Sequence, residues 1–161
     1  MISQRQKKNE RKKERKKMAQ QQLIANNQEG AEIYHGESIC KQKSHELLAE
    51  INLPKGLLPL NDLVEVGYNR ATGFVWLKQK KRTEHKFRSI GRNVSYDTEV
   101  TAFVEDRRMR RLTGVKSKEL LIWVSISDIY TDAPDSKKIT FANSTGLARS
   151  FPISAFELDE N

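Results

Sequence analysis

Residues 120–130 read LLIWVSISDIY, and apolar side chains recur at every second position. In an extended strand, Leu120, Ile122, Val124 and Ile126 would point to one face and the residues between them to the other. The stretch is longer than the roughly five or six residues of an average strand. Such length is typical of a strand that curves through a barrel or crosses a large sheet. The stretch therefore predicts a β-rich fold.

The two-residue period begins at Leu63 and predicts further short strands. They are expected at Leu63–Tyr68, Phe74–Lys78, His85–Ile90, Glu99–Glu105, Arg108–Leu112, Lys138–Ala142 and Arg149–Ile153. Turn sequences separate several of these strands, and most of the connections are short. About eight strands joined in this way favour an antiparallel β-barrel or sandwich, built as a meander. Trp76 and Trp123, which lie on strands, are expected in its core.

One helix is predicted ahead of the strands, over Glu37–Ile51, because Cys40, Leu47 and Leu48 recur at helical spacing. The predicted fold is therefore mostly all-β with one N-terminal α-helix. The segment Pro54–Pro59 follows this helix. Its prolines and its glycine prevent regular structure, yet the leucines between them favour burial. We expect this apolar loop to pack across the end of a hydrophobic core.

The composition bounds the class of protein. The chain has 161 residues and a formal net charge of +8, with 37% hydrophobic and 31% charged residues. No apolar run approaches the roughly 18 residues of a membrane-spanning helix, and a single cysteine cannot form an internal disulfide. The first residues lack the apolar segment of a secretory signal. We therefore expect a cytoplasmic monomer, with a nuclear location open through its basic N-terminal segment.

Most of the excess positive charge lies in residues 1–30, which contain nine Lys and Arg and three Glu. Large apolar residues there are too few to offset the entropy of ordering the segment. We predict a disordered basic tail over 1–30 and a single β-barrel domain over 31–161. The tail is open to three interpretations: a solvated extension, a segment that binds nucleic acid without reading its sequence, or one attracted to anionic lipid headgroups.

Several short motifs occur in a distinctive order. They are Glu32–Gly36 (EIYHG), Leu53–Pro59 (LPKGLLP), Val66–Asn69 (VGYN), Gly73–Lys78 (GFVWLK), Leu112–Lys116 (LTGVK), Leu120–Val124 (LLIWV) and Ser150–Glu157 (SFPISAFE). Over about residues 31–158 the chain resembles the plant family called domain of unknown function 538. The resemblance implies a plant protein with an N-terminal helix before an antiparallel β-barrel. It also implies, as expectations, the stress-linked roles, the similarity to lipid-binding bactericidal/permeability-increasing proteins and the chlorophyll hydrolysis proposed for that family. It supplies no catalytic residues.

The sequence offers little for catalysis. It lacks the Gly-x-Ser-x-Gly motif that presents the nucleophile of α/β-hydrolases. A cysteine nucleophile would have to be Cys40, activated by His35, His45 or His85. Its place on the apolar stripe of the predicted helix favours plain core packing instead. The histidines show no metal-binding spacing. We therefore predict no catalytic residue, no metal site and no cofactor, and the sequence leans away from an enzyme.

Two basic clusters remain on the predicted domain, next to turns. Charged residues at such positions keep a sheet from pairing with its neighbours, and they would also suit an anionic surface. With the apolar loop they make up the candidate binding residues: Gly56, Leu57, Leu58, Lys80, Lys81, Arg82, Arg108 and Arg110. The leading hypothesis is a non-enzymatic module that binds an apolar small molecule or an anionic lipid surface. The alternatives are a chlorophyll-ester hydrolase and sequence-independent nucleic-acid association through the tail.

Overall fold

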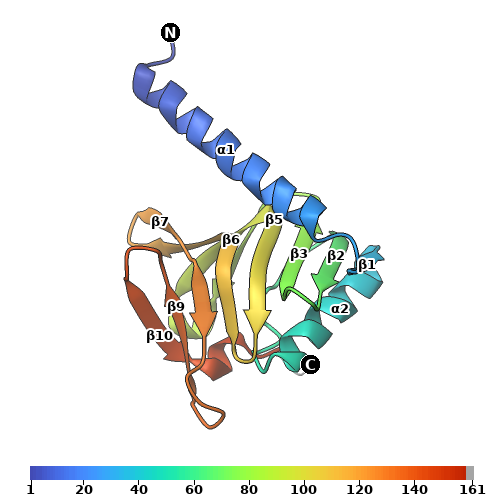
Figure 1. The fold of residues 1–161 in the computed structure, drawn as a ribbon. Helices are drawn as coiled ribbons and strands as arrows, with labels where there is room; N and C mark the ends of the chain where they lie inside the picture. The colour runs from blue at the N-terminus through green and yellow to red at the C-terminus, as the bar shows by residue number, and fades with distance from the viewer. Residues whose placement is uncertain (159–161) are drawn as a thin grey trace.

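The structure is a computed structural model that describes residues 1–158 (Figure 1). Its helices are α1 (Gln4–Asn26), α2 (Glu37–Glu50) and the short 3-10 helices η1 (Arg88–Ile90) and η2 (Ile153–Phe156). Its strands are β1 (Glu32–His35), β2 (Leu63–Asn69), β3 (Phe74–Gln79), β4 (Thr83–Phe87), β5 (Arg92–Glu105), β6 (Arg108–Glu119), β7 (Ile122–Ser125), β8 (Asp128–Tyr130), β9 (Lys138–Ala142) and β10 (Ala148–Pro152).

All ten strands of the described residues belong to one antiparallel sheet. The hydrogen-bonded order is β1-β2-β3-β5-β6-β8-β9-β10, with β4 beside β5 and β7 beside β6. The path ends at β1 and β10, so the sheet curves without closing into a barrel (Figure 1). The prediction of a mostly β, antiparallel meander with an N-terminal helix is confirmed. The strands number ten rather than about eight.

The predicted strand over 120–130 is wrong as a single strand. A turn at Leu120 and Leu121 joins β6 to β7, which pairs with the C-terminal end of β6, whereas β8 pairs with its N-terminal end. Leu120 has φ of 55°, in the left-handed region. The two-residue period shows that side chains alternate, but it carries no information on which partner each segment pairs with. The sequence pattern therefore predicts the strand character and misses the turn.

The main core lies between α2 and the curved sheet. Leu47 and Leu48 of α2 are buried, as the helical spacing predicts. The loop that follows α2 closes this core, since Leu57 and Leu58 are only 1% and 3% exposed. The hydroxyl of Tyr96, itself buried, donates to the carbonyl oxygen of Leu57 at 3.0 Å. The expectation that this loop packs across a hydrophobic core is confirmed.

The structure places α1 over most of residues 1–30, the segment for which the composition predicts a disordered tail. Its Lys, Arg, Gln and Glu residues have high intrinsic helix propensity, and Ser3 caps its N-terminus through a capping box. At the other end Ile24, 4% exposed, packs against Phe74 and Trp76 of β3. Ile24, with the partly buried Leu23 beside it, anchors the C-terminal end of the helix. The N-terminal half of the helix extends away from the sheet (Figure 1).

Trp76 is fully buried between α1 and the sheet, as predicted for the core. Gly67 lies directly opposite it on β2, and a Cβ atom at residue 67 would overlap the indole ring. The indole Nε1 donates to Oε2 of Glu65 at 2.8 Å. The other carboxylate oxygen of Glu65 lies 2.8 Å from His35 Nε2. A half-buried carboxylate therefore fixes the orientation of the largest core side chain.

Glu65 is expected to make the protein less stable in acid. Burial raises the pKa of this carboxyl, but hydrogen bonds from Trp76 and His35 and the charge of Lys78 lower it by more, so its pKa lies below the ordinary 4.5. The unfolded state then binds more protons than the folded state, so the stabilisation is complete above the ordinary pKa and is lost as pH falls through the folded one. The free energy of unfolding, measured in urea, should fall less steeply between about pH 6 and pH 3 in Glu65→Gln than in the wild type. The control is the exposed Glu84→Gln; equal slopes in all three proteins would contradict the prediction.

Candidate functional site

A cavity of about 730 Å³ opens at the end of the sheet where β6 turns into β7 and β9 turns into β10. We call it the groove. Pockets for small molecules typically measure about 300–1,000 Å³, so its size suits a ligand. Its lining residues are Arg92, Ser117, Glu119, Leu120, Ile122, Val124, Ile126, Phe141, Asn143, Leu147, Arg149 and Phe151.

One wall of the groove comes from β7 and the residues next to it. Leu120, Ile122, Val124 and Ile126 all line it. These are the four side chains that the alternation in residues 120–130 assigns to a common face, and this part of the prediction is confirmed. Ser125 lies between two of them, is exposed and does not line the groove. The strand alternation thus gives the groove an apolar wall.

One end of the groove is charged. Arg92 Nη1 lies 3.0 Å and Arg149 Nε 3.4 Å from the same carboxylate oxygen of Glu119. The guanidinium of Arg92 also stacks over the ring of Phe151, 5.3 Å from its centroid. The hydrogen bond from Arg92 holds the pKa of Glu119 below its ordinary value, despite partial burial. Two guanidinium groups therefore share one carboxylate, and this end carries a net positive charge.

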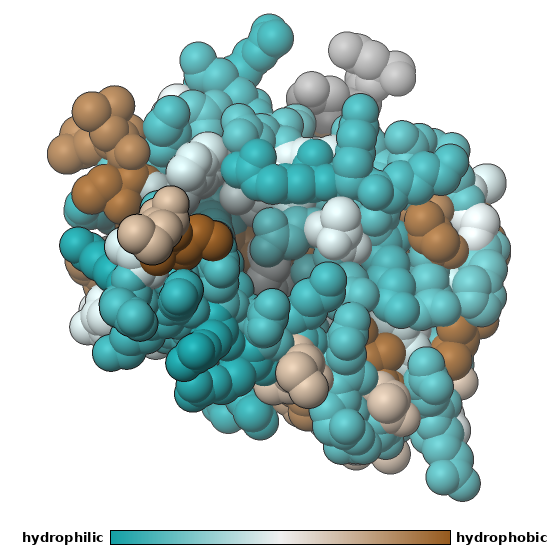
Figure 2. Space-filling view, turned by 90° about the horizontal axis from the view of Figure 1, so that it is seen from above, coloured by the Kyte–Doolittle hydropathy of each residue, from teal (hydrophilic) through white to brown (hydrophobic). Residues whose placement is uncertain are grey.

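The mouth of the groove exposes large apolar side chains. On the β6–β7 turn, Leu120, Leu121 and Ile122 are 93%, 90% and 68% exposed, and Leu147 on the β9–β10 loop is 57% exposed. We call these four residues the apolar rim. Figure 2 shows hydrophobic side chains gathered at one edge of the molecule, on the side where Figure 1 places β7. Isolated exposed apolar residues are ordinary, but a group of them marks a candidate contact surface.

Trp123 on β7 is half-buried, contrary to the prediction that it lies in the core. Its ring lies 5.5 Å from Cζ of Arg82 and 5.7 Å from Nζ of Lys118. Trp123 follows Ile122 of the apolar rim directly in sequence. An aromatic ring flanked by two cations therefore adjoins the exposed apolar side chains.

The structure separates the two predicted basic clusters. Lys80, Lys81 and Arg82 are exposed at the turn between β3 and β4, and Arg82 reaches Trp123 as described above. Arg108 and Arg110 lie at the N-terminal end of β6, whereas the groove forms at its C-terminal end. Arg108 stacks over the ring of Tyr130, and Arg110 forms an ion pair of 2.8 Å with Glu105.

The apolar loop lies apart from the groove. Leu57 and Leu58 are core side chains, and Gly56 packs against the backbone of Phe156 in η2. None of the eight predicted binding residues lines the groove. Its charged residues, Arg92, Glu119 and Arg149, come from three strands that are far apart in sequence, and no local motif marks them. The one sequence signal for the site is the apolar alternation that begins at Leu120.

Cys40 is fully buried in the core, as predicted. Its Sγ donates to the carbonyl oxygen of Tyr34 at 3.3 Å, and burial raises the pKa of the thiol. A neutral thiol is a poor nucleophile. His35, one of the histidines considered as its activator, instead lies against Glu65. Within residues 1–158, no group of three or more His, Cys, Asp or Glu side chains could hold a metal ion.

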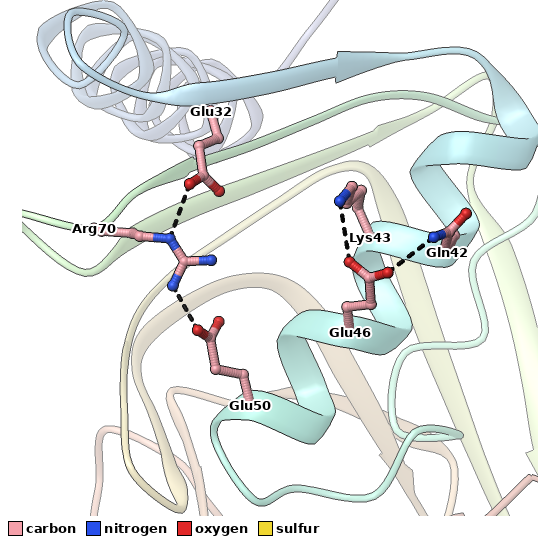
Figure 3. A network of polar contacts seen from close by, with 6 residues as sticks. All are labelled: Glu32, Gln42, Lys43, Glu46, Glu50 and Arg70. Carbon is pink, nitrogen blue, oxygen red and sulfur yellow. Dashed lines mark hydrogen bonds and ion pairs between the residues drawn. The ribbon is translucent and has the colours of Figure 1, made fainter.

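A second cluster of charged side chains connects α2 to the sheet (Figure 3). Arg70 lies 3.0 Å from Glu32 on β1 and 2.6 Å from Glu50 at the end of α2. These two carboxylates raise the pKa of the guanidinium further above its ordinary value. On α2 itself, Glu46 pairs with Lys43 at 3.1 Å and with Gln42 at 2.9 Å. All these groups satisfy one another, so we assign the cluster to holding α2 in place rather than to ligand binding.

The comparison with known families agrees with the sequence motifs. A family model described as "Protein of unknown function, DUF538" matches residues 44–157, more than half of the chain. The protein belongs to the DUF538 family. The whole groove lies inside the matched region, whereas α1 and β1 lie outside it. Neither a curated protein nor a solved structure matches this DUF538 chain. In residues 1–158, no helix is both long enough and apolar enough to cross a bilayer.

Proposed function

We propose that this DUF538 protein acts by binding, and that the groove takes up an amphipathic small molecule with an anionic group. One observation carries the proposal: a cavity of about 730 Å³ has a continuous apolar wall and a positively charged end. The apolar part of the ligand would lie against Val124 and Ile126. Its anionic group would compete with Glu119 for Arg92 and Arg149, two donors suited to carboxylate, sulfonate or phosphate.

The other two hypotheses stay predictions. Among the described residues, the lining of the groove includes one serine, Ser117, and neither histidine nor cysteine. It therefore lends no support to ester hydrolysis by an activated nucleophile. Association with nucleic acid would rest on α1, whose basic side chains are exposed and lie outside the groove. The groove supports binding of a small molecule best.

The proposal predicts which substitutions impair ligand binding. The probe is anilinonaphthalene sulfonate, a fluorescent molecule with an apolar ring system and one negative charge. Val124→Asp places a carboxylate in the apolar wall and should weaken probe binding about tenfold or more. Ser125→Asp adds the same charge one residue along but outside the groove, and should leave binding unchanged.

The charged end has its own test. Arg149→Gln should weaken binding of the sulfonate probe about tenfold, the effect of losing one charge-assisted hydrogen bond. It should leave binding of neutral phenylnaphthylamine unchanged, because that probe has no anionic group. Equal effects of Val124→Asp and Ser125→Asp, or the absence of saturable binding in the wild type, would overturn the proposed function.

A further inference from the structure

The apolar rim is unusual in both composition and placement. Leu120, Leu121 and Ile122 are consecutive and form the projecting tip of the β6–β7 turn, where small and polar residues are typical. Leu120 takes a left-handed φ of 55°, which glycine or asparagine adopts at less cost. Leu147 reaches the same groove from the β9–β10 loop. The other exposed large apolar side chains in the described residues are scattered: Met1, Ile2, Met18, Val64 and Leu158.

Cationic side chains surround the apolar rim. Arg92 and Arg149 lie at the charged end of the groove, and Arg82 and Lys118 flank Trp123. Arg149 and Arg82 keep 54% and 46% of their side chains exposed. Lys and Arg interact with lipid phosphates, while tryptophan prefers the boundary between headgroups and acyl chains. Along the β6–β7 hairpin, Glu119 with its two arginines lies opposite Ile122, and Lys118 lies opposite Trp123. Apolar, aromatic and cationic side chains thus lie next to one another at this turn, and an anionic bilayer accommodates all three.

We propose that the apolar rim inserts into an anionic phospholipid bilayer and places the mouth of the groove at the membrane surface. A protein partner is disfavoured because a stable interface buries about 800 Å² per partner on a broad, complementary face, whereas this patch is a narrow projecting turn. The fluid acyl layer accepts such a turn without a matching shape. The inference rests on the proposed function in one respect: the groove would exchange its ligand with the bilayer.

Co-sedimentation tests the insertion. The probes are vesicles of phosphatidylcholine with phosphatidylserine, and vesicles of phosphatidylcholine alone. Leu121→Asp should weaken binding to the anionic vesicles about tenfold or more, because it moves a charge into the acyl layer. The residue is 90% exposed, so the variant should fold normally. The matched control is Leu158→Asp, an exposed leucine that neither belongs to the apolar rim nor lines the groove, and it should bind like the wild type.

The cationic layer is tested in the same assay. Arg82→Gln should weaken binding to the anionic vesicles about fivefold, since one basic residue near such a surface contributes about 1 kcal/mol. The control is Arg110→Gln at the opposite end of β6, which should leave binding unchanged. The difference between Arg82→Gln and the wild type should disappear on vesicles of phosphatidylcholine alone.

Tryptophan fluorescence locates the contact. The chain has two tryptophans, and Trp76 is fully buried, so quenching by brominated phospholipid in the bilayer should come from Trp123. Trp123→Phe should remove this quenching and leave the emission of Trp76. Quenching that survives Trp123→Phe would overturn the proposal. So would vesicle binding that Leu121→Asp leaves unchanged, which would indicate attraction through α1 alone.

The outcomes separate this inference from the proposed function. Leu121 does not line the groove. Leu121→Asp should therefore still bind anilinonaphthalene sulfonate in solution, while its binding to anionic vesicles is lost. Weaker probe binding in Val124→Asp, with vesicle binding unchanged, would support both the groove and the membrane contact as separate sites. The absence of probe binding in the wild type, with insertion intact, would overturn the proposed function and leave the apolar rim as a membrane anchor.

Discussion

Replacing Gly67 with alanine is expected to lower the free energy of unfolding by about 3 kcal/mol, toward the upper end for an overpacked core. Gly67 lies opposite Trp76 in the β2–β3 register, and a methyl group there would overlap the indole ring. The ring has little freedom to move aside, because Ile24 and Phe74 pack against it and Glu65 accepts its hydrogen bond. Equilibrium urea unfolding measures the change.

A double-mutant cycle shows whether the ring is the cause. Trp76→Leu removes the indole, keeps an apolar side chain and should itself cost about 2 kcal/mol or more. In that background Gly67→Ala should become neutral, or stabilise the strand by about 0.5 kcal/mol, because alanine loses less backbone entropy than glycine. An equal cost of Gly67→Ala in both backgrounds would show that the close approach to Trp76 is not responsible.

Alternation along the chain predicts where strands occur better than where they begin and end. β2, β3 and β9 match the expected ranges closely, whereas β5 and β6 are much longer than expected. The β5–β6 pairing contains register shifts between Tyr96 and Phe103. Each bulge inserts an unpaired residue and breaks the two-residue period. A pattern that depends on strict alternation therefore loses the strand at the bulge, although the backbone pairing continues beyond it.

Composition alone does not predict α1. A count of apolar residues in the segment predicts disorder, because it considers only the contacts that the segment can make within itself. In the structure the stabilising contact is tertiary: Ile24 occupies a site formed by Phe74 and Trp76, and Gln20 donates to Thr113 at 3.0 Å. The partners lie about 50 to 90 residues away in sequence. No local pattern in the first 30 residues contains that information.

The groove shows the same division between local and distant information. Its apolar wall is local, so the alternation from Leu120 to Ile126 predicts that these side chains share a face. Its charged end requires Arg92, Glu119 and Arg149 to meet from β5, β6 and β10. Only the pairing of the strands brings them together. The basic clusters are easy to see in the sequence because their members are neighbours in the chain. Closeness in the chain does not determine which residues line the groove.

Gly56 in the apolar loop provides a second large effect. Gly56→Ala is expected to lower the free energy of unfolding by about 2–3 kcal/mol, because its Cβ would collide with the carbonyl oxygen of Phe156. A backbone oxygen cannot rotate away as a side chain can, so η2 would have to move. Phe156 is 1% exposed, and its ring lies 4.7 Å from that of Phe87 and 5.1 Å from that of Phe141. Movement of η2 would therefore loosen this aromatic cluster as well.

The result separates two roles for the loop around Gly56. A loop that served only to contact a ligand would tolerate one added methyl group, and the urea midpoint of Gly56→Ala would equal that of the wild type. A loop that closes the core cannot accept it. Lys55→Ala is the matched control, because this neighbouring side chain is exposed and its loss should change stability by less than about 0.5 kcal/mol. A fall in stability for Gly56→Ala alone would show that the leucines beside it are buried to complete the core, which leaves ligand contact to the residues that line the groove.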